Sequence, residues 1–242
     1  MTRRAKVRII KSEVFNLKNV EYGEIRYPNY SNVEKNAEID IHDVVGIYGQ
    51  NGSGKTAIIE ALDIIKSIMS GIPINFEEYE GIVSTDRTTK ISIFFFLEVN
   101  QEKYKAKYDV ELIRVEKMIQ IKSERLSYWQ RGSGWKSQRS IYLENMYYNN
   151  ENILNGIETN VELSNEKVMN KSKFIKSIQK IAMFCAQRNV SIFFNDLITT
   201  MYDCNMEFDK EDDVLSKILV GLIDFGRIGC YVVKVNQLGD IN

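Results

Sequence analysis

A glycine-rich stretch at residues 49–56 is the part of this sequence whose residue types and spacing point most directly to chemistry. It fits the pattern G-x-x-x-x-G-K-[ST], with the residues Gly49, Gln50, Asn51, Gly52, Ser53, Gly54, Lys55 and Thr56. Glycines let the backbone curl so that successive N–H groups point inward as an anion nest. A helix that begins directly after the loop adds partial positive charge at the same place. The pattern therefore predicts a phosphate-binding loop.

Two residues of this loop have distinct expected roles. We expect the ammonium group of Lys55 to reach the β- and γ-phosphates of a nucleotide, and the hydroxyl of Thr56 to ligate Mg²⁺. A glycine-rich turn that binds nothing is the alternative. It fits less well because the sequence on both sides of the loop has the character that the motif requires.

The flanking segments must hold the loop in place. Residues 44–48 are a short apolar run rich in β-branched residues, which predicts a buried parallel strand. Residues 56–69 have apolar side chains at helical spacing, and Gly71 and Pro73 end the pattern. The sequence thus predicts strand, loop and helix in succession. The apolar residues of the helix are Ile58, Ile59, Leu62, Ile65 and Met69.

The rest of the chain predicts a mixed α/β fold. Residues 5–15 and 20–27 are expected to pair as strands, with a polar loop over 28–40. Turns are expected at Asn100-Gln101 and around 131–134. They separate four successive antiparallel strands, at 89–99, 103–113, 117–129 and 135–143. Further on we expect a loop at 144–170, helices at 172–187 and 212–225, and a strand at 230–235.

Composition and charge limit the possible classes. The chain is 44% hydrophobic and 27% charged, with a net charge of −1, so no overall field recruits nucleic acid or an anionic membrane. No apolar run approaches the ~18 residues of a membrane span, and we see no signal peptide. Three cysteines (Cys185, Cys204 and Cys230) suit a reducing compartment. We therefore expect a cytoplasmic protein without membrane contact.

Two groups of lysines could contact phosphates. Lys103, Lys105 and Lys107 alternate onto one strand face, and the helix around 171–180 carries four lysines. A solvated face explains both groups better, because acids are interleaved with local basic residues along the chain. A role in nucleic-acid binding therefore cannot be argued from charge.

The stretch GQNGSGKT followed by AIIEAL resembles the ABC-type ATPases. The resemblance is to the RecF/SMC-like branch and to the bacterial AAA-domain proteins grouped with OLD-family and abortive-infection ATPases. Residues 14–20 resemble the opening strand of that family, and residues 89–143, with SERLSYW at 123–129, resemble its sheet and arm. The resemblance is specific over 1–70 and thin beyond 143.

The resemblance implies a RecF-like P-loop ATPase lobe with an antiparallel β-sheet arm, a C-terminal helical segment, and ATP with Mg²⁺ as ligands. It also implies that Lys18 and Asn19 lie near the nucleotide, although a solvent-facing turn explains them equally well. Glu60 has a familiar place in the motif helix, but an exposed helical glutamate explains it as well. By the same resemblance, the full-length form is expected to be a homodimer that acts on DNA or on an effector protein, in phage defence or DNA metabolism.

The residues that hydrolysis needs are missing from the sequence. An ATPase of this class requires an apolar Walker B strand ending in Asp-Glu, a signature serine and glycine, and a switch histidine. The segments that come closest to these motifs have the wrong residue types or lie at the wrong point in the chain. They are 94–98, 191–196, 219–224, 163–166, Gln101 and the single histidine, His42. We therefore leave the catalytic residues unassigned and expect a truncated chain or the N-terminal part of a longer ATPase. Its expected parts are a P-loop lobe at 1–88, the sheet of the same lobe at 89–143, and a loop and helical segment at 144–242 that ends before Walker B.

Two other interpretations stay open. A complete small P-loop enzyme, such as a nucleotide kinase or a GTPase, would use an unusual acid such as Asp196 or Asp224. Against it, the N-K-x-D stretch of GTPases fails at 165–168 and at 170–173, and no arginines cluster as in a kinase lid. A non-catalytic nucleotide-binding module is the other interpretation, and its dimerisation would not depend on ATP.

Overall fold

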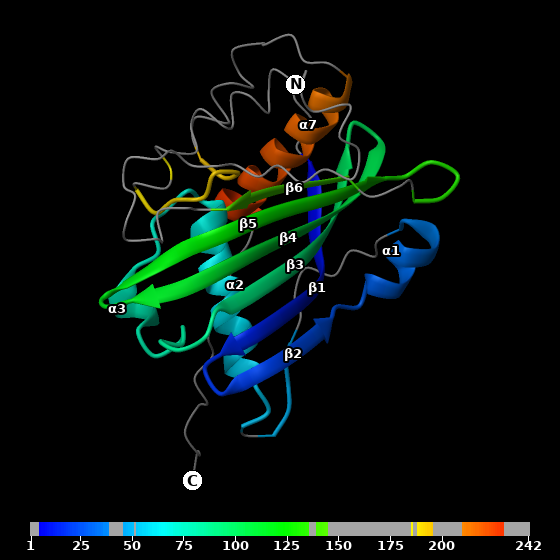
Figure 1. Ribbon diagram of the computed structural model, residues 1–242. Coiled ribbons are helices and arrows are strands. Elements are labelled where there is room, and N and C mark those ends of the chain that lie inside the picture. The colour runs from blue at the N-terminus through cyan, green and yellow to red at the C-terminus, as the bar shows by residue number, and fades with distance from the viewer. Residues whose placement is uncertain are drawn as a thin grey trace.

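A single antiparallel sheet of six strands, in the order β2-β1-β3-β4-β5-β6, dominates the computed structural model (Figure 1). The structure describes residues 5–38, 46–50, 52–135, 139–144, 185, 188–195 and 210–229. The strands are β1 (Lys6–Leu17), β2 (Val20–Arg26), β3 (Thr89–Val99), β4 (Glu102–Val115), β5 (Met118–Gln130) and β6 (Arg139–Glu144). The six antiparallel strands predicted at 5–15, 20–27, 89–99, 103–113, 117–129 and 135–143 are thus confirmed where the structure describes them, within a few residues at their ends.

Tight hairpins connect most of the sheet. The turn between β3 and β4 lies at Asn100 and Gln101, as predicted, and both residues have the left-handed backbone conformation, with φ of 51° and 70°. Strands β3 to β6 follow one another as neighbours, whereas β1 pairs with β3 across a long stretch of chain. This stretch contains the phosphate loop and the helix that follows it, so both lie, in the sequence, between two strands that are neighbours in the sheet.

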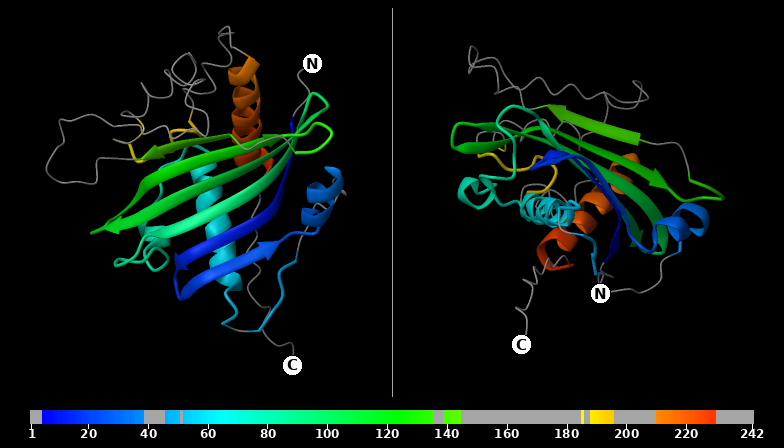
Figure 2. Two further views of the ribbon diagram at one scale, coloured as in Figure 1. Left: turned by 45° about the vertical axis from the view of Figure 1, so that its right-hand side comes forward. Right: turned by 90° about the horizontal axis from the view of Figure 1, so that it is seen from below.

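Two long helices cover one face of the sheet (Figure 2): α2 (Lys55–Met69) and α7 (Lys210–Asp224). Both match predicted helices. Helix α7 continues as a π-helical turn, η2 (Phe225–Gly229), which approaches the end of α2 closely. A Cβ atom at Gly226 would lie 2.5 Å from the Cβ of Met69, so only glycine fits at this contact. A short helix, α3 (Phe76–Tyr79), follows α2.

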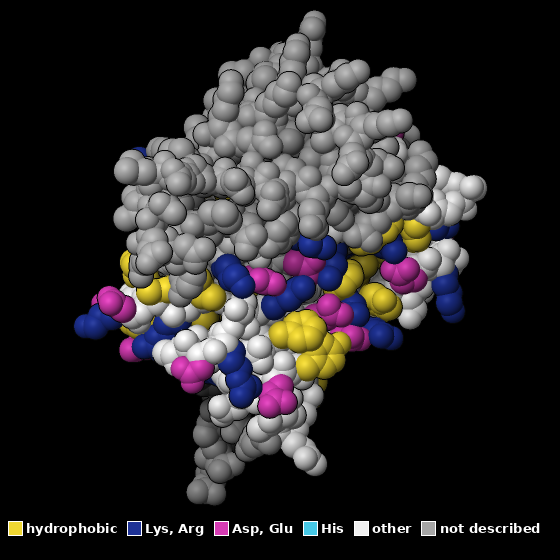
Figure 3. Space-filling view, viewed as in Figure 1, with side chains coloured by type: hydrophobic (Ala, Val, Ile, Leu, Met, Phe, Trp, Pro, Cys, Tyr) yellow, Lys and Arg dark blue, Asp and Glu magenta, His cyan; other side chains and the backbone are white. Residues whose placement is uncertain are grey.

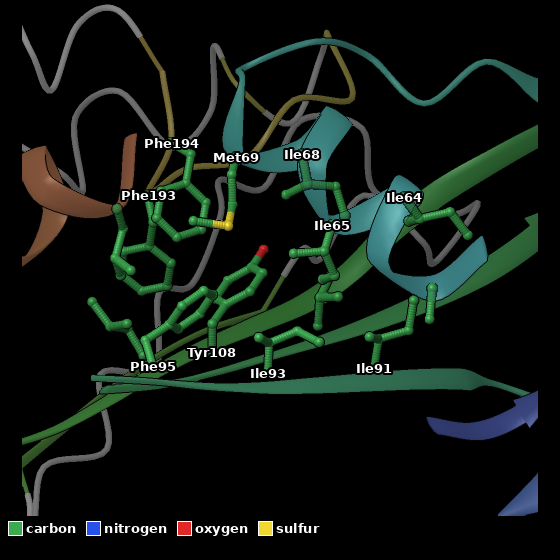
Figure 4. Close-up of a cluster of buried hydrophobic side chains, with 14 of the residues drawn as sticks. Ile64, Ile65, Ile68, Met69, Ile91, Ile93, Phe95, Tyr108, Phe193 and Phe194 are labelled. Atoms are coloured by element: carbon green, nitrogen blue, oxygen red, sulfur yellow. The ribbon is translucent and has the colours of Figure 1, made fainter. Parts of the chain in front are cut away.

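The core between α2 and the sheet is apolar and closely packed. Figure 4 shows isoleucines of α2 pointing toward Ile91, Ile93 and Phe95 of β3. The ring of Phe194 meets the ring of Tyr108 from β4 edge-on, with centroids 4.8 Å apart. The buried residues of α2 are Ala57, Ile58, Glu60, Ala61, Ile64, Ile65, Ile68 and Met69. Ile59 and Leu62, which were expected in the core, are only partly buried, because the apolar face of α2 is centred on Ile64 and Ile68.

The prediction of a loop over 28–40 is wrong for the residues that form α1 (Tyr30–Asn36). Val33 and Ala37, four residues apart, are buried against Phe96, in a small apolar cluster separate from the main core. A seven-residue helix is too short to be stable by itself, so this packing stabilises it. The polar composition of the segment concealed its two buried residues.

The sheet face opposite α2 is charged, and two lysines of the predicted group, Lys105 and Lys107, form ion pairs. Lys105 forms an ion pair with Glu34 of α1 at 2.9 Å, and Lys107 forms one with Asp109 at 2.9 Å. The Lys105 ammonium also lies 4.9 Å from the centre of the Trp135 ring. In Figure 3, basic and acidic side chains are interspersed over the described part of this face. These contacts favour the interpretation of a structural sheet face over phosphate contact.

Several predictions lie outside the described residues. These are the loop at 144–170, the strand at 230–235, the lysine-rich helix at 172–187 apart from the buried Cys185, and the residues Cys204, Cys230 and His42. Within the described part of the chain, no helix has both the length and the apolar character that a membrane span requires.

Candidate functional site

The segment that leads into the phosphate loop differs from the prediction. Residues 46–48 form no strand, and Tyr48 is 93% exposed. Val44 and Val45 lie outside the described residues. The buried parallel strand is therefore wrong for residues 46–48. The described sheet explains this result, because β1 and β3 pair directly with each other and leave only β2 and β6 as edges.

The loop itself has the backbone that its glycines predict. Gly52 and Gly54 have φ of 82° and 81°, in the left-handed region that side-chain-bearing residues rarely adopt. The N–H of Ser53 donates to the carbonyl of Gln50 at 3.2 Å and closes a turn. A Cβ atom at Gly49 would lie only 3.0 Å from the Ser53 hydroxyl oxygen. The described loop residues are thus tightly curled. Asn51 lies outside the described residues.

Helix α2 begins directly at the end of the loop. Gly54 is its N-cap and provides no side-chain cap, so the first N–H groups of the helix remain available as donors. The Lys55 ammonium folds back over the loop and donates to the carbonyls of Gly49 and Gln50, at 2.5 and 2.6 Å. Thr56 is exposed in the first turn. Main-chain N–H groups, one ammonium group and one hydroxyl form a donor set that fits a polyphosphate with Mg²⁺.

The turn between β1 and β2 lies beside this loop. Lys18 and Asn19 form the turn, and the next residue, Val20, comes close to the loop, since a Cβ atom at Gly54 would lie 3.2 Å from its methyl group. The backbone of Lys18 is in the left-handed region, with φ of 52°, and its N–H donates to the carbonyl of Ile82 at 2.9 Å. The turn is thus adjacent in sequence to a residue that contacts the end of the loop, while contact of Lys18 and Asn19 with a nucleotide stays a prediction.

Glu60 of α2 is buried, so the structure does not support the alternative of an exposed helical glutamate. Only 7% of Glu60 is exposed, and its Oε1 atom accepts a bond from the Lys18 ammonium at 2.6 Å. Its other oxygen, Oε2, is buried without a hydrogen-bond donor among the described residues. The sequence signal for a position near the loop is the spacing of Glu60, which lies one helical turn after Thr56 on the same face of α2.

Among the sequence candidates for catalysis, the structure describes residues 94–98, 191–195 and 219–224 and Gln101. Glu98 pairs with Lys6 at 3.7 Å, Gln101 belongs to the β3–β4 turn, and Asp224 ends α7. Residues 191–195 are buried in the core, whereas Asp196, His42 and residues 163–166 lie outside the described part of the chain. In that part, no three His, Cys, Asp or Glu side chains gather as a metal site.

A second buried carboxylate, Glu124 of β5, lies in the core and had no signal in the sequence. It is 1% exposed and accepts bonds from the Tyr108 hydroxyl at 2.6 Å, the Ser191 hydroxyl at 2.5 Å and the Ile192 N–H at 2.8 Å. Burial raises the pKa of the Glu124 carboxyl, and these hydrogen bonds act in the opposite direction. Asn189 adds two bonds to the backbone of β5. These contacts fasten residues 188–195 to the sheet.

Comparison with known proteins identifies one similarity. Residues 44–132 match the model of a protein family described as an AAA domain, putative AbiEii toxin, of a type IV toxin–antitoxin system. The match spans the phosphate loop, α2 and strands β3 to β5. No curated protein and no solved structure matches the chain. This part of the chain is therefore similar to a nucleotide-binding, ATPase-like domain of a kind that generally uses ATP and Mg²⁺.

Proposed function

We propose that this chain is the ATP-binding part of an ABC/RecF-like ATPase and holds Mg-ATP in the loop 49–56. The observation that carries the proposal is the loop's geometry: Lys55 folds back over a turn that two left-handed glycines shape, at the uncapped start of α2. In this proposal the N–H groups at the start of α2 hold the phosphates, Lys55 binds the β- and γ-phosphates, and Thr56 ligates Mg²⁺. Magnesium would supply charge neutralisation on the phosphates.

Hydrolysis is the finer part of the proposal. The described residues around the loop offer no Asp-Glu pair that would hold the metal and orient water. We therefore propose that turnover depends on residues beyond this site and on a second protomer that completes it. The similarity to an abortive-infection AAA domain supports a role in phage defence, with an effector protein or DNA as the target of the dimer.

Calorimetric titration of ATP with Mg²⁺ into the purified chain and its Lys55→Ala variant tests the binding site. Each charge-assisted bond from Lys55 contributes ~1.5–3 kcal/mol, so the variant should bind ATP at least ~10-fold more weakly. Lys66→Ala, in the last turn of the same helix, is the matched control and should bind as the wild type does. Unchanged affinity in a folded Lys55→Ala variant would overturn the proposal.

Steady-state turnover separates the proposal from the two other interpretations. Binding of ATP without its hydrolysis supports a nucleotide-binding site that needs further residues for hydrolysis. Turnover that disappears in Lys55→Ala would instead indicate a complete enzyme with an acid such as Asp224 or Asp196 in the catalytic role. Dimerisation that is independent of ATP, measured by sedimentation, would indicate a non-catalytic module.

A further inference from the structure

The ion pair between Lys18 and Glu60 joins the β1–β2 turn to the helix that follows the phosphate loop. Glu60 lies four residues after Thr56, so the two side chains are neighbours on one face of α2, about 5–6 Å apart at their Cβ atoms. Val20 packs against the N-cap of the same helix, as the 3.2 Å approach at Gly54 indicates. The ammonium group of Lys18 is therefore held at Glu60, one helical turn after Thr56 on the same face of α2.

The electrostatics of the pair do not suit a contact that only stabilises the fold. Glu60 is buried, and one of its two oxygens has no donor among the described residues, which is energetically unfavourable for a buried charged group. A buried ion pair stabilises a fold as well as apolar residues of similar volume would only if all of its hydrogen-bonding atoms have partners. The side chain of Lys18, in contrast, is 33% exposed. The pair thus reaches from the buried side of α2 to the surface beside the loop.

The Lys18 ammonium has more N–H donors than acceptors among the described residues. An ammonium group carries three N–H donors, and among the described residues the Glu60 carboxylate is the one partner that Lys18 Nζ contacts. The backbone of Lys18 is fixed by the hydrogen bond from its N–H to the Ile82 carbonyl and by its left-handed conformation, so the side chain starts from a defined position. A cation held in this way, next to the donor-rich start of a helix, is suited to bind an anion.

We propose that Glu60 is a positioning residue that holds the Lys18 ammonium beside the phosphate loop, where the remaining donors bind the phosphates of the nucleotide. The inference rests on the proposed function and deepens it. It adds the β1–β2 turn as a second wall of the site, and it gives the buried carboxylate of α2 a role that acts through Lys18.

Calorimetric titration with ATP and with ADP tests this inference, using Lys18→Ala, Glu60→Gln, Lys18→Arg and the double variant. We expect the first two variants to bind ATP ~5- to 10-fold more weakly, because each loses a charge-assisted contact or its orientation. Lys18→Arg should retain most of the affinity. The double variant should bind no more weakly than Lys18→Ala, because Glu60 acts through Lys18.

Lys11→Ala is the matched control. Lys11 lies on the same hairpin and pairs with Glu13 and Glu24 at 2.6 and 3.0 Å, on contacts that do not involve α2. This variant should lower the stability to urea and leave the ATP affinity unchanged. Wild-type ATP affinity in a folded Lys18→Ala variant would overturn the inference, and this outcome is readable even where Glu60→Gln fails to fold.

The outcomes for the inference and for the proposed function are distinct. Loss of ATP binding in Lys55→Ala, together with unchanged binding in Lys18→Ala and Glu60→Gln, refutes only the positioning role. Absence of ATP binding by the wild-type chain, or unchanged binding in Lys55→Ala, refutes the nucleotide site and the positioning role together. Equal losses for ATP and for ADP would place Lys18 at the phosphates that the two nucleotides share, whereas a loss confined to ATP would place it at the γ-phosphate, and both support the role.

Discussion

Replacing Glu124 by alanine should lower the free energy of unfolding by ~3–5 kcal/mol. The substitution removes the acceptor of three buried donors, on Tyr108, Ser191 and Ile192. Each buried donor left without an acceptor costs about 1–3 kcal/mol. Part of this loss is offset because the variant no longer buries a carboxylate. The backbone N–H of Ile192 contributes most, since it cannot rotate toward another partner as the two hydroxyl groups can.

Glu124→Gln keeps the shape of the side chain and separates the effect of the proton from that of the cavity. Because burial raises the pKa of the Glu124 carboxyl above its ordinary 4.5, the folded protein binds this proton more tightly than the unfolded chain does. The resulting stability is fully present below pH 4.5 and is lost as the pH rises through the raised pKa. The stability of the wild type relative to Glu124→Gln should therefore fall with pH, by up to ~1.4 kcal/mol per pH unit.

Urea unfolding followed by tryptophan fluorescence, at several pH values from about 5 to about 8, measures both effects. The two tryptophans, Trp129 and Trp135, lie on or next to β5 and report on this part of the sheet. Glu111→Gln is the control, because the Glu111 carboxylate is partly exposed and lies 3.6 Å from Lys122, and such pairs contribute less than ~1 kcal/mol. An alanine variant within ~1 kcal/mol of the wild type, or parallel pH profiles for wild type and Glu124→Gln, would refute the reasoning.

Two further perturbations address the contacts of residues 188–195. Phe194→Ala should lower the free energy of unfolding by ~3–5 kcal/mol, because Phe194 is fully buried. Tyr22→Ala, at a residue that is 53% exposed, should cost far less, and similar urea midpoints for the two variants would contradict this packing. Asn189→Ala should cost ~1–2 kcal/mol and speed hydrogen exchange at the Ile121 amide, whose acceptor is the Asn189 side chain; unchanged exchange would show that this bond does not protect the amide.

The elements that the sequence predicted correctly have strong local patterns. The alternation within β3 to β5 and the helical spacing of α2 and α7 depend on residues close in the chain, so each pattern can be read without knowing the fold. The curled loop followed from the same kind of local signal, because the glycines of 49–56 have fixed spacing. The turn at Asn100-Gln101 is another local feature that the structure confirms.

The features that the sequence did not predict depend on contacts between distant segments. The burial of Glu60 requires Lys18, which lies on a different hairpin, and the burial of Glu124 requires residues 191–192. Helix α1 forms because Val33 has a place on the sheet, not because its own sequence favours a helix. Residues 46–48 show the converse, since an apolar run forms a strand only where a sheet offers it an edge.

The connection between β1 and β3 has a consequence for the order in which the protein folds. Strands β3 to β6 can pair one after another through short turns, whereas β1 ends at Leu17 and its partner β3 begins only at Thr89. Closing this long loop costs chain entropy before any of its contacts form, so pairing of β1 should be a late step in folding. The phosphate loop and α2 lie within the closed segment. The phosphate loop and α2 therefore gain the β1–β2 hairpin as a neighbour only when β1 pairs with β3, late in folding. Destabilising this hairpin should disorder the phosphate loop before it unfolds strands β3 to β6.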